Sequence, residues 1–420
     1  VLAAINEERL FIPASTRKLV PSALAVRHLG PEESLQTVVH AASAPVAGVV
    51  SGDLVLRAVG DPTWNAETGG LTGRARLNRL ARQVADVGVT RVDGDLVIDT
   101  SRFIDPAPMP PAWNWEDFQT SYGSIPSVLG IDRNLARVEV GPGSPGSPPR
   151  EQLGEDARAY EVVNEAVTAR AGAAPTLQLF RGLDGTRLML TGQMAADAAA
   201  GARSIPMGDP VRVAAEEFLA ALREAGITVR GGVRMSGSSI PQGEVLGVLT
   251  GAPVSAMLAR ANEDSDNYLA ESLYLLAGAK VYARGSYEAS HKAEEAFWKS
   301  LKVDPTLCVP ADGSGLSRKN HVAPRAMTAL LVAMADEEAF TSSLAVAGHT
   351  GTLRYRLGEQ KLAGRVRAKT GTLDGVAALA GYATRNNGQT VAFCIMANNY
   401  TTSASPIRAR IDEIVGVLAR

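Results

Sequence analysis

The part of the chain from Ala252 onward has an order of elements that only a few folds can accommodate. Apolar residues at three-to-four spacing predict helices at 253–261, 266–278, 287–301 and 325–336. Three strands follow at 362–369, 375–385 and 389–398, and a closing helix covers about 405–419. A helical block, a β meander and a final helix predict an α+β fold, with an antiparallel sheet that carries helices on both faces.

The region before Ala252 changes character near the turn Gly60-Asp61-Pro62. Beyond that turn, helical and strand patterns are mixed, as in the helix at 210–225 and the strand at 229–235. We therefore expect one discontinuous domain, 1–60 with 246–420, and an inserted accessory region at 61–245. The insert could divide into two subdomains, about 61–95 with 175–245 and about 96–174.

Size and charge exclude several classes of protein. The chain has 420 residues with a formal net charge of −2, so no excess of basic residues favours nucleic acid as a partner. No apolar run is long enough for a transmembrane helix. The chain opens abruptly at Val1-Leu2-Ala3-Ala4-Ile5, which reads as the middle of a strand, so we expect the natural N-terminus and any export signal to be missing.

The cysteines and histidines do not form a metal-binding pattern. Cys308 and Cys394 lack ligand spacing, and the five histidines are scattered, so we expect no metal and no cofactor. Cys394 lies in an apolar run and is more simply a buried thiol than half of a disulfide.

Ser15 and Lys18 stand three residues apart at the start of an apolar run that reads as a helix. Such positions share a helix face, so the Lys18 amine can reach the Ser15 hydroxyl. A serine with a lysine beside it is a candidate activated nucleophile, whereas the plainer alternative is a helix cap with a solvated lysine. Pro21 lies inside the same pattern and predicts a kink or a local break.

Two later segments support the interpretation of Ser15 and Lys18 as a catalytic pair. Ser265-Asp266-Asn267 precedes a predicted helix, and Lys369-Thr370-Gly371-Thr372 lies near the end of the first of the three strands. Alone, the first reads as a helix N-cap and the second as a strand end. In the order SxxK, SDN, KTG, they match the motif set of class A β-lactamases and penicillin-binding proteins.

The neighbourhoods of these motifs narrow the resemblance. They are Gly60-Asp61-Pro62, Asp312–Asn320, Gly351-Thr352-Leu353, Ala368–Leu373 and Leu379–Tyr382. The chain resembles the low-molecular-mass class C penicillin-binding proteins, which are the D-alanyl-D-alanine carboxypeptidases/endopeptidases of peptidase family S13. The resemblance covers nearly the whole chain, including the interval of 250 residues between Ser15 and Ser265. It implies the serine β-lactamase/DD-peptidase fold with a long insert.

The five motif residues suit an acyl-transfer site. Ser15, at a helix N-terminus, is the expected nucleophile, and Lys18 the expected base, made neutral by burial and by the nearby cation of Lys369. The Ser265 hydroxyl can relay a proton to the leaving amine. The Asn267 amide can hold the substrate backbone and Lys18. Lys369 is a fixed cation suited to the terminal carboxylate of the substrate.

The rest of the KTG segment completes this interpretation. Thr370 and Thr372 add hydroxyl donors, and Gly371 allows a close approach of the backbone. By the resemblance, the oxyanion hole is formed by the backbone N–H groups of Ser15 and Thr372. The strand would pair with the substrate peptide as an added strand. The implied reaction is acylation of Ser15 with release of D-alanine, followed by hydrolysis.

Recognition of the substrate side chain is assigned to three further residues. By position relative to the motifs, Asp117, Tyr122 and Arg318 resemble residues that family members place around the free end of diaminopimelate. The alternatives are a loop carboxylate, a packed aromatic ring and a surface arginine. The assignment requires the inserted region to fold over the active site.

Other functions fit the same residues less well. A β-lactamase needs a deacylating glutamate, and no Glu-x-x-Leu-Asn segment lies between Asn267 and Lys369. An esterase of this fold usually lacks KTG. A catalytically weak cell-wall-binding relative would not be expected to keep the five motif residues intact.

The resemblance also implies partners and a location. The expected partners are peptidoglycan stem peptides ending in D-Ala-D-Ala, with β-lactams as covalent inhibitors, in the periplasm or outside a bacterial cell. The balance of carboxypeptidase and endopeptidase activity, the third stem residue and the oligomeric state stay open.

Overall fold

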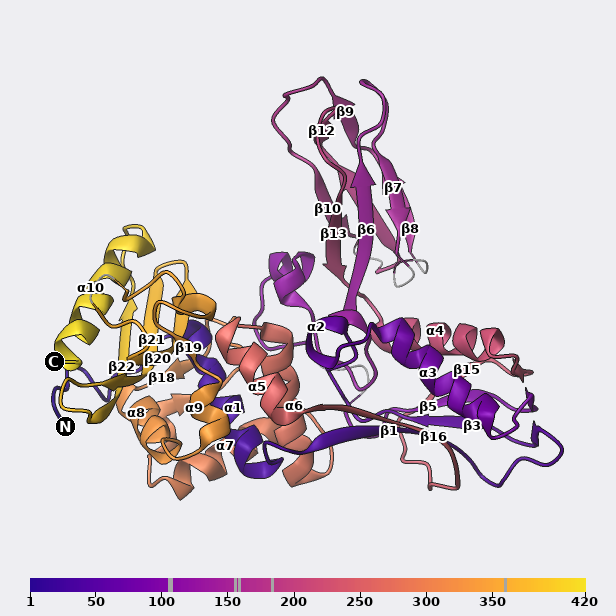
Figure 1. The fold of residues 1–420 in the computed structure, drawn as a ribbon, viewed down its shortest axis with the longest axis horizontal. Helices are drawn as coiled ribbons and strands as arrows, with labels where there is room; N and C mark the ends of the chain where they lie inside the picture. The colour runs from indigo at the N-terminus through magenta and orange to yellow at the C-terminus, as the bar shows by residue number, and fades with distance from the viewer. Residues whose placement is uncertain (105–108, 155–156, 158–159, 183–184, 359–360) are drawn as a thin grey trace. The chain divides into compact units, whose positions relative to one another are not determined.

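A computed structural model describes the chain except for residues 105–108, 155–156, 158–159, 183–184 and 359–360 (Figure 1). The chain divides into two compact units. Unit 1 comprises Val1–Leu35, Ser101–Trp113 and Thr250–Arg420, and unit 2 comprises Gln36–Thr100 and Asn114–Leu249.

These bounds differ from those of the expected domains, because residues 36–60 lie in unit 2 and residues 101–113 lie in unit 1. Strand β3 (Leu54–Arg57) pairs with β5 (Leu96–Asp99), which ties the earlier segment to unit 2. Phe103 forms a β-bridge with Gly285, which ties the later segment to unit 1. Pairings this distant in sequence leave no local pattern from which the boundaries could be read.

Unit 1 is the helix-rich part of the molecule. Its helices are η1 (Ala14–Lys18), α1 (Leu19–His28), α5 (Val254–Glu263), α6 (Asn267–Tyr282), α7 (Tyr287–Ser300), η6 (Pro305–Leu307), α8 (Pro324–Ala333), α9 (Glu338–Ser342), η7 (Gly351–Leu353) and α10 (Ala404–Leu418). Its strands are β17 (Cys308–Val309), β18 (His321–Val322), β19 (Ala345–Val346), β20 (Val366–Leu373), β21 (Val376–Thr384) and β22 (Thr390–Asn398). Over the described ranges, none of the helices is long and apolar enough to cross a membrane.

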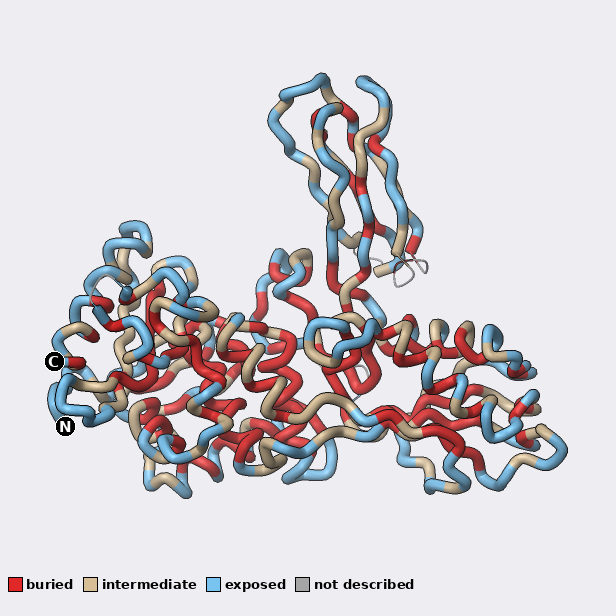
Figure 2. Tube along the Cα trace, viewed as in Figure 1, coloured by how far each residue is buried: buried red, intermediate tan, exposed pale blue. Residues whose placement is uncertain are grey.

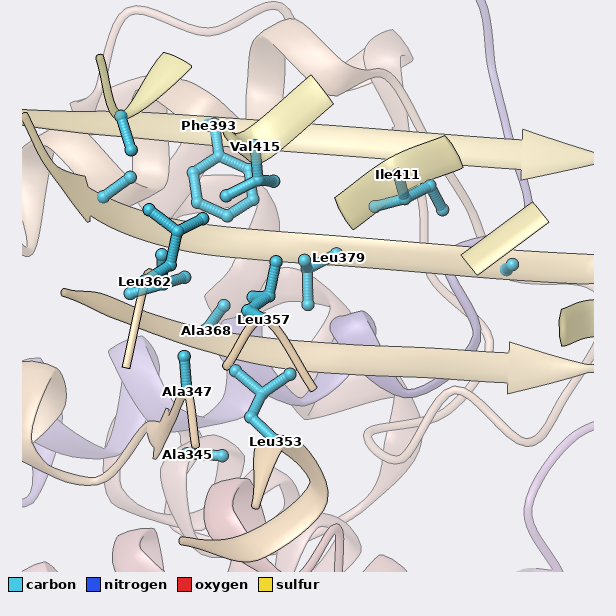
Figure 3. Close-up of a cluster of buried hydrophobic side chains, with 14 residues drawn as sticks. Ala345, Ala347, Leu353, Leu357, Leu362, Ala368, Leu379, Phe393, Ile411 and Val415 are labelled. Carbon is cyan, nitrogen blue, oxygen red and sulfur yellow. The ribbon is translucent and has the colours of Figure 1, made fainter. Parts of the chain in front are cut away.

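The main sheet of unit 1 is antiparallel, with the strand order β19-β20-β21-β22. Strand β21 is buried along nearly its whole length, so both faces of the sheet are covered. On one face, Leu379 and Phe393 lie in one buried cluster with Ile411 and Val415 of α10 (Figure 3). On the other, the Tyr382 hydroxyl donates to the Leu331 carbonyl oxygen of α8 at 2.6 Å. The predicted α+β fold with helices on both faces is confirmed.

Strand β20 begins four residues later than the strand predicted at 362–369. Lys369 therefore lies in the middle of the strand and not near its end. The reason is that pairing with β21 continues without interruption through Lys369-Thr370-Gly371-Thr372, although lysine and glycine are depleted in strands.

Helix α6 is the central helix of unit 1. Every residue from Tyr268 to Ala279 is buried, so the helix has no solvent-facing stripe. It packs against α1, α5 and α7. Figure 2 draws buried residues in red. The predicted helix at 266–278 was placed correctly at its start and ended one turn early.

The helix that carries Lys18 changes type just before Pro21. The 3-10 helix η1 gives way to α1 at Leu19, so Pro21 lies in the first turn of the α-helix. Proline is tolerated there because the N–H groups of a first turn have no partner within the α-helix.

Unit 2 combines small sheets with two amphipathic helices. Its helices are α2 (Ala66–Gly69), α3 (Gly73–Asp86), η2 (Trp115–Gln119), η3 (Ser121–Gly123), η4 (Asp132–Asn134) and α4 (Pro210–Glu224). Its largest sheet has the order β15-β5-β3-β1-β16, formed with β1 (Ser34–Ala41), β15 (Val233–Ser236) and β16 (Glu244–Pro253). The remaining strands are β2 (Val49–Val50), β4 (Arg91–Val92), β6 (Leu135–Gly141), β7 (Arg150–Leu153), β8 (Glu161–Asn164), β9 (Val167–Ala169), β10 (Gln178–Arg181), β11 (Arg187–Thr191), β12 (Gln193–Ala195), β13 (Gly201–Pro206) and β14 (Thr228–Val229).

Strand pairing within unit 2 differs from the expected subdomains. Strand β13 pairs with β6, β11 with β8, and β12 with β9, so residues 187–206 are joined to 135–169. Among the described residues, β14 pairs with β4 and so joins 175–245 to 61–95 as expected, whereas β15 pairs with β5, which falls in the other expected subdomain. The division 61–95 with 175–245 therefore does not follow the sheets.

The two cysteines are free thiols. Cys394 is half-buried on β22, and burial raises the pKa of its thiol to about 12. It therefore stays protonated at neutral pH, as a structural thiol does.

Candidate active site

Ser15 lies on η1, whose first turn is closed by Pro13. The Pro13 carbonyl oxygen accepts hydrogen bonds from the Thr16 N–H at 3.3 Å and from the Thr16 hydroxyl at 2.7 Å. Ala14 has a φ of +47°, a left-handed conformation that costs energy for a residue with a side chain. Ser15 is half-buried while the other residues of η1 are buried, so its hydroxyl is the polar group that the turn leaves accessible.

Lys18 is fully buried and makes three hydrogen bonds. Its Nζ lies 3.0 Å from Ser15 Oγ, 2.7 Å from Asn267 Oδ1 and 2.8 Å from the Ser314 carbonyl oxygen. Burial lowers the pKa of Lys18 to about 8, against the opposing pull of nearby carboxylates, of which Asp312 is the strongest. At neutral pH, the neutral amine is therefore much more abundant than it would be at the ordinary pKa of a lysine.

The SDN segment bends sharply into α6. Ser265 has a φ of +64°, and the Asp266 side chain caps the helix by accepting the Leu269 N–H at 3.1 Å. Asn267 is the first residue of α6, from which its amide reaches Lys18. The Ser265 hydroxyl oxygen lies 2.9 Å from Lys369 Nζ. The N-cap and the site are thus parts of the same turn.

Lys369 projects from β20 and is fully buried. Its Nζ contacts Ser265 Oγ and, at 3.0 Å, the Thr370 carbonyl oxygen. Burial lowers the pKa of Lys369 well below its ordinary value, and the charge of Lys18 lowers it further. The sequence interpretation named Lys369 as one cause of the lowered pKa at Lys18. In the structure, burial is the cause at Lys18, and the repulsion between the two lysines acts on Lys369.

Strand β20 has an open edge beside these residues. Among the described residues, β19 pairs with it no further along than Ala368. The Thr384 N–H donates to the Arg365 carbonyl oxygen at 2.8 Å, and the antiparallel pattern alternates from there. The backbone groups of Thr370 and Thr372 therefore point away from β21, toward the open edge.

Gly371 brings β20 against the turn that carries Ser15. A Cβ atom at Gly371 would lie 2.6 Å from the Pro13 carbonyl oxygen and 3.2 Å from the Ser15 nitrogen. Only glycine allows the two backbones to approach this closely. The SxxK, SDN and KTG residues are therefore brought together in unit 1, from a turn, a helix start and a strand.

Comparison with known proteins agrees with this geometry. The chain matches the D-Ala-D-Ala carboxypeptidase 3 (S13) family over residues 1–420. The chain belongs to this family. Its enzyme class is therefore that of a serine-type D-Ala-D-Ala carboxypeptidase, and the resemblance drawn from the motifs is confirmed.

Two relatives and two solved structures illustrate the match. The D-alanyl-D-alanine carboxypeptidase of Actinomadura sp. (strain R39) is 34% identical over 426 residues, covering 96% of this chain and 77% of the relative. D-alanyl-D-alanine carboxypeptidase DacB of Haemophilus influenzae is 29% identical over 412 residues, covering 96% and 83%. Penicillin binding protein 4 (dacB) from H. influenzae matches in structure with a TM-score of 0.87 and 27% identity, covering 100% of this chain and 93% of that chain. A second structure of that protein, complexed with a β-lactam, matches with a TM-score of 0.83 and 26% identity over the same shares.

The loop at 312–320 contributes more to this S13 site than the sequence indicated. In the sequence, Asp312–Asn320 served only as one of the neighbourhoods that carry the family resemblance. The buried Asp312 carboxylate accepts the N–H groups of Gly315 at 2.7 Å and Ser317 at 2.6 Å, and it accepts from Asn320 Nδ2 at 2.7 Å. The Ser314 carbonyl oxygen contacts Lys18 directly.

Sequence reasoning missed Ser314 and also Glu271, a buried carboxylate on α6 that accepts the Ser314 N–H. Ser314 acts through its backbone, which no residue pattern reveals. Glu271 did leave a signal, because it is an acid four residues after Asn267 in a helix that is otherwise largely apolar.

The three side-chain recognition residues are divided between the two units. Asp117 and Tyr122 lie in unit 2, where the Tyr122 hydroxyl is 3.4 Å from Asp117 Oδ1. The buried Asp117 carboxylate also accepts the Asn114 N–H at 2.8 Å, which closes the turn of η2. Arg318 lies in unit 1, is exposed, and donates to the Asp374 carbonyl oxygen.

Proposed function

We propose that this carboxypeptidase works through an acyl-enzyme on Ser15, with neutral Lys18 as the base. The arrangement of hydrogen bonds around Lys18 carries the proposal. Two of its partners, Asn267 Oδ1 and the Ser314 carbonyl oxygen, can only accept. A neutral amine has two N–H groups and one lone pair, so both N–H groups are used and the lone pair faces the Ser15 hydroxyl. That is the geometry of a base removing the proton of its nucleophile.

The second lysine and serine suit the departure of the product. Ser15 Oγ attacks the carbonyl carbon of the penultimate D-alanine, the peptide C–N bond breaks, and the leaving amine needs a proton. Ser265, held at 2.9 Å from Lys369 Nζ, is the hydroxyl proposed to pass that proton from Lys18. Water then attacks the ester and restores Ser15.

The open edge of β20 is the proposed binding strand for the substrate backbone. An extended peptide can pair with the outward-facing groups of Thr370 and Thr372 as an added strand. The Thr372 N–H, together with that of Ser15, would form the oxyanion hole, where two N–H donors stabilise the tetrahedral intermediate. Lys369, with the Thr370 hydroxyl beside it, is the proposed partner of the terminal carboxylate.

The substrate is proposed to be a peptidoglycan stem peptide ending in D-Ala-D-Ala, with the enzyme in the bacterial cell envelope, where that polymer lies. Asp117, Tyr122 and Arg318 stay proposed for the third stem residue. The Asp117 carboxylate, paired with the Tyr122 hydroxyl, is suited to an ammonium group, and the Arg318 guanidinium is suited to a carboxylate. Unit 1 is proposed as the catalytic domain and unit 2 as the accessory region inserted in it.

β-Lactams are proposed to acylate the same serine. Penicillin binding protein 4 from H. influenzae forms a complex with a β-lactam, and the family to which this chain belongs is that of D-Ala-D-Ala carboxypeptidases. Without a Glu-x-x-Leu-Asn segment before Lys369, we expect the acyl-enzyme to persist, so that the β-lactam inhibits and is not turned over.

Penicillin labelling tests the proposed function. The wild type should become covalently labelled by a fluorescent penicillin and should release D-alanine from a pentapeptide. Ser15→Ala should abolish both, whereas Ser51→Ala, at an exposed serine in unit 2, should leave both unchanged. Absence of labelling in the folded wild type, or full labelling of Ser15→Ala, would contradict the mechanism. Cleavage of a cross-linked dimer in the same preparation would measure endopeptidase activity.

A further inference from the structure

Glu271 is a fully buried carboxylate that has no part in the acyl-transfer steps described above. It lies one helical turn after Asn267 on α6, so the two side chains share a face of the helix. A carboxylate placed in such a core destabilises the fold unless hydrogen bonds compensate its lost solvation. Three groups do so: the Ser314 N–H at 2.7 Å, the Gly313 N–H at 3.0 Å and the Tyr287 hydroxyl at 2.9 Å.

These contacts fix the residue whose carbonyl oxygen binds Lys18. The Ser314 N–H belongs to the peptide plane before Ser314, and Glu271 accepts it. The Ser314 carbonyl oxygen belongs to the next plane, which also contains the Gly315 N–H, and Asp312 Oδ1 accepts that group at 2.7 Å. Two buried carboxylates therefore hold the two peptide planes on either side of Ser314.

We propose that Glu271 is a positioning residue for acylation, which holds the Ser314 carbonyl oxygen where it takes one N–H of Lys18 and so aims the lone pair at Ser15. The proposal rests on the proposed function of Lys18. It gives α6 two of the three partners of that amine, Asn267 directly and Ser314 through Glu271. The carboxylate does not touch the reacting atoms, so its effect is on geometry.

The charge of Glu271 has a second, separable effect. The ionisable groups around it are Tyr287 on α7, Asp312 in the loop and Lys18 on η1. Burial and the charge of Asp312 raise the pKa of Glu271 to about 7, against the N–H bonds of the loop. In turn, the Glu271 carboxylate raises the pKa of Lys18. Removing that charge while keeping the shape should therefore lower the pKa of Lys18.

The test compares Glu271→Gln and Glu271→Ala with Asp412→Asn. The control removes a buried carboxylate of unit 1 that instead pairs with Arg356, at 2.7 Å, far along the chain in α10. The rate constant of acylation by a fluorescent penicillin is measured from pH 5 to pH 10, with thermal unfolding to establish that each variant is folded.

We expect Glu271→Gln to lower the acylation rate constant at the alkaline plateau by about 10-fold, and Glu271→Ala by up to about 100-fold, as misplaced catalytic groups do. The affinity of the initial complex should be unchanged, and Asp412→Asn should react like the wild type. The midpoint of the rise with pH should move to lower pH in Glu271→Gln.

A plateau in folded Glu271→Gln equal to that of Asp412→Asn would overturn the positioning role. An unshifted midpoint would overturn the link to the charge of Lys18. If Glu271→Ala fails to fold, the near-isosteric Gln variant decides alone. Failure of the wild type to label would contradict the proposed function, whereas a normal wild type with a normal Glu271→Gln would contradict only this inference.

Discussion

The salt bridge between Arg17 and Glu294 allows a sharp test of how the nucleophile turn is held. Arg17 precedes Lys18 on η1, and the side chains of Arg17 and Glu294 are 5% and 1% exposed. The guanidinium contacts both carboxylate oxygens, at 2.6 and 2.5 Å, and its Nε donates to the Asp312 carbonyl oxygen at 2.8 Å. The Tyr274 hydroxyl also donates to Glu294, at 2.6 Å. One buried acid thus ties the turn to two helices.

The variant Glu294→Gln keeps the shape and removes the charge. It leaves the Arg17 guanidinium buried without a carboxylate in contact. The amide N–H₂ group then replaces one of the two carboxylate oxygens that had accepted a hydrogen bond, so a donor that used that oxygen faces another donor. Removal of one partner from a buried pair typically costs about 3–5 kcal/mol. We expect the free energy of unfolding in urea at 25 °C to fall by about that amount. The midpoint of unfolding should fall with it, because the slope depends on surface area, which is unchanged.

Glu295→Gln is the matched control on the same helix. The Glu295 carboxylate pairs with Lys299 at 2.5 Å, but the Lys299 side chain is 62% exposed and the Glu295 side chain 53%. The loss in free energy of unfolding should therefore stay within about 1 kcal/mol. Adding Arg17→Met to Glu294→Gln should recover part of the loss, because no unpaired charge remains. A loss for Glu294→Gln no larger than that of Glu295→Gln would refute the reasoning.

The pH dependence of stability follows from the same pair. Burial alone would raise the pKa of Glu294, but the Arg17 guanidinium outweighs it and holds the pKa below its ordinary value. When folding lowers the pKa of an acid, the acid stabilises the folded state at pH values above its pKa in the unfolded chain. That stabilisation is lost as the pH falls through its pKa in the folded protein. The difference in free energy of unfolding between the wild type and Glu294→Gln, measured in urea, should therefore be constant around neutral pH and shrink in acid.

Two further predictions concern the reacting groups. Gly371→Ala should lower the free energy of unfolding by about 1–3 kcal/mol and slow penicillin labelling, because its Cβ would lie 2.6 Å from the Pro13 carbonyl oxygen. Chemical denaturation and the rate of labelling measure the two effects. Wild-type values in both would contradict the close approach of the two backbones. In the wild type, the labelling rate should rise with pH through about 8 and level off above it, because Lys18 must lose its proton to act as a base. Lys18→Arg should not be labelled at any pH in this range. A wild-type rate that does not change with pH across the range would rule out Lys18 as the base.

The ordered motifs and the C-terminal elements were accessible from sequence for identifiable reasons. Ser15 and Lys18 are close because they share one turn, and α10 shows a regular apolar stripe. The contact of Lys369 with Ser265 joins segments 104 residues apart, and only the family resemblance indicated it.

The features that sequence reasoning missed depend on backbone geometry. The role of Ser314 is that of a carbonyl oxygen, so any residue type could stand there. The extension of β20 beyond Lys369 depends on its pairing with β21, which overrides the low strand preference of Lys369 and Gly371. The unit boundaries depend on strand partners such as β3 and β5, whose pairing leaves no trace in either strand alone.

The burial of α6 accounts for the precision of a site that is assembled from distant segments. The chain leaves unit 1 at Leu35 and at Trp113 and returns each time, but the entropy lost in closing a loop grows only with the logarithm of its length. A long insert between Ser15 and Ser265 therefore costs little. Geometry is the harder requirement, because the Lys18 lone pair must be aimed. A helix packed on all sides is a rigid support, and α6 holds Lys18 through Asn267 at its first residue and, one turn later, through Glu271 and Ser314.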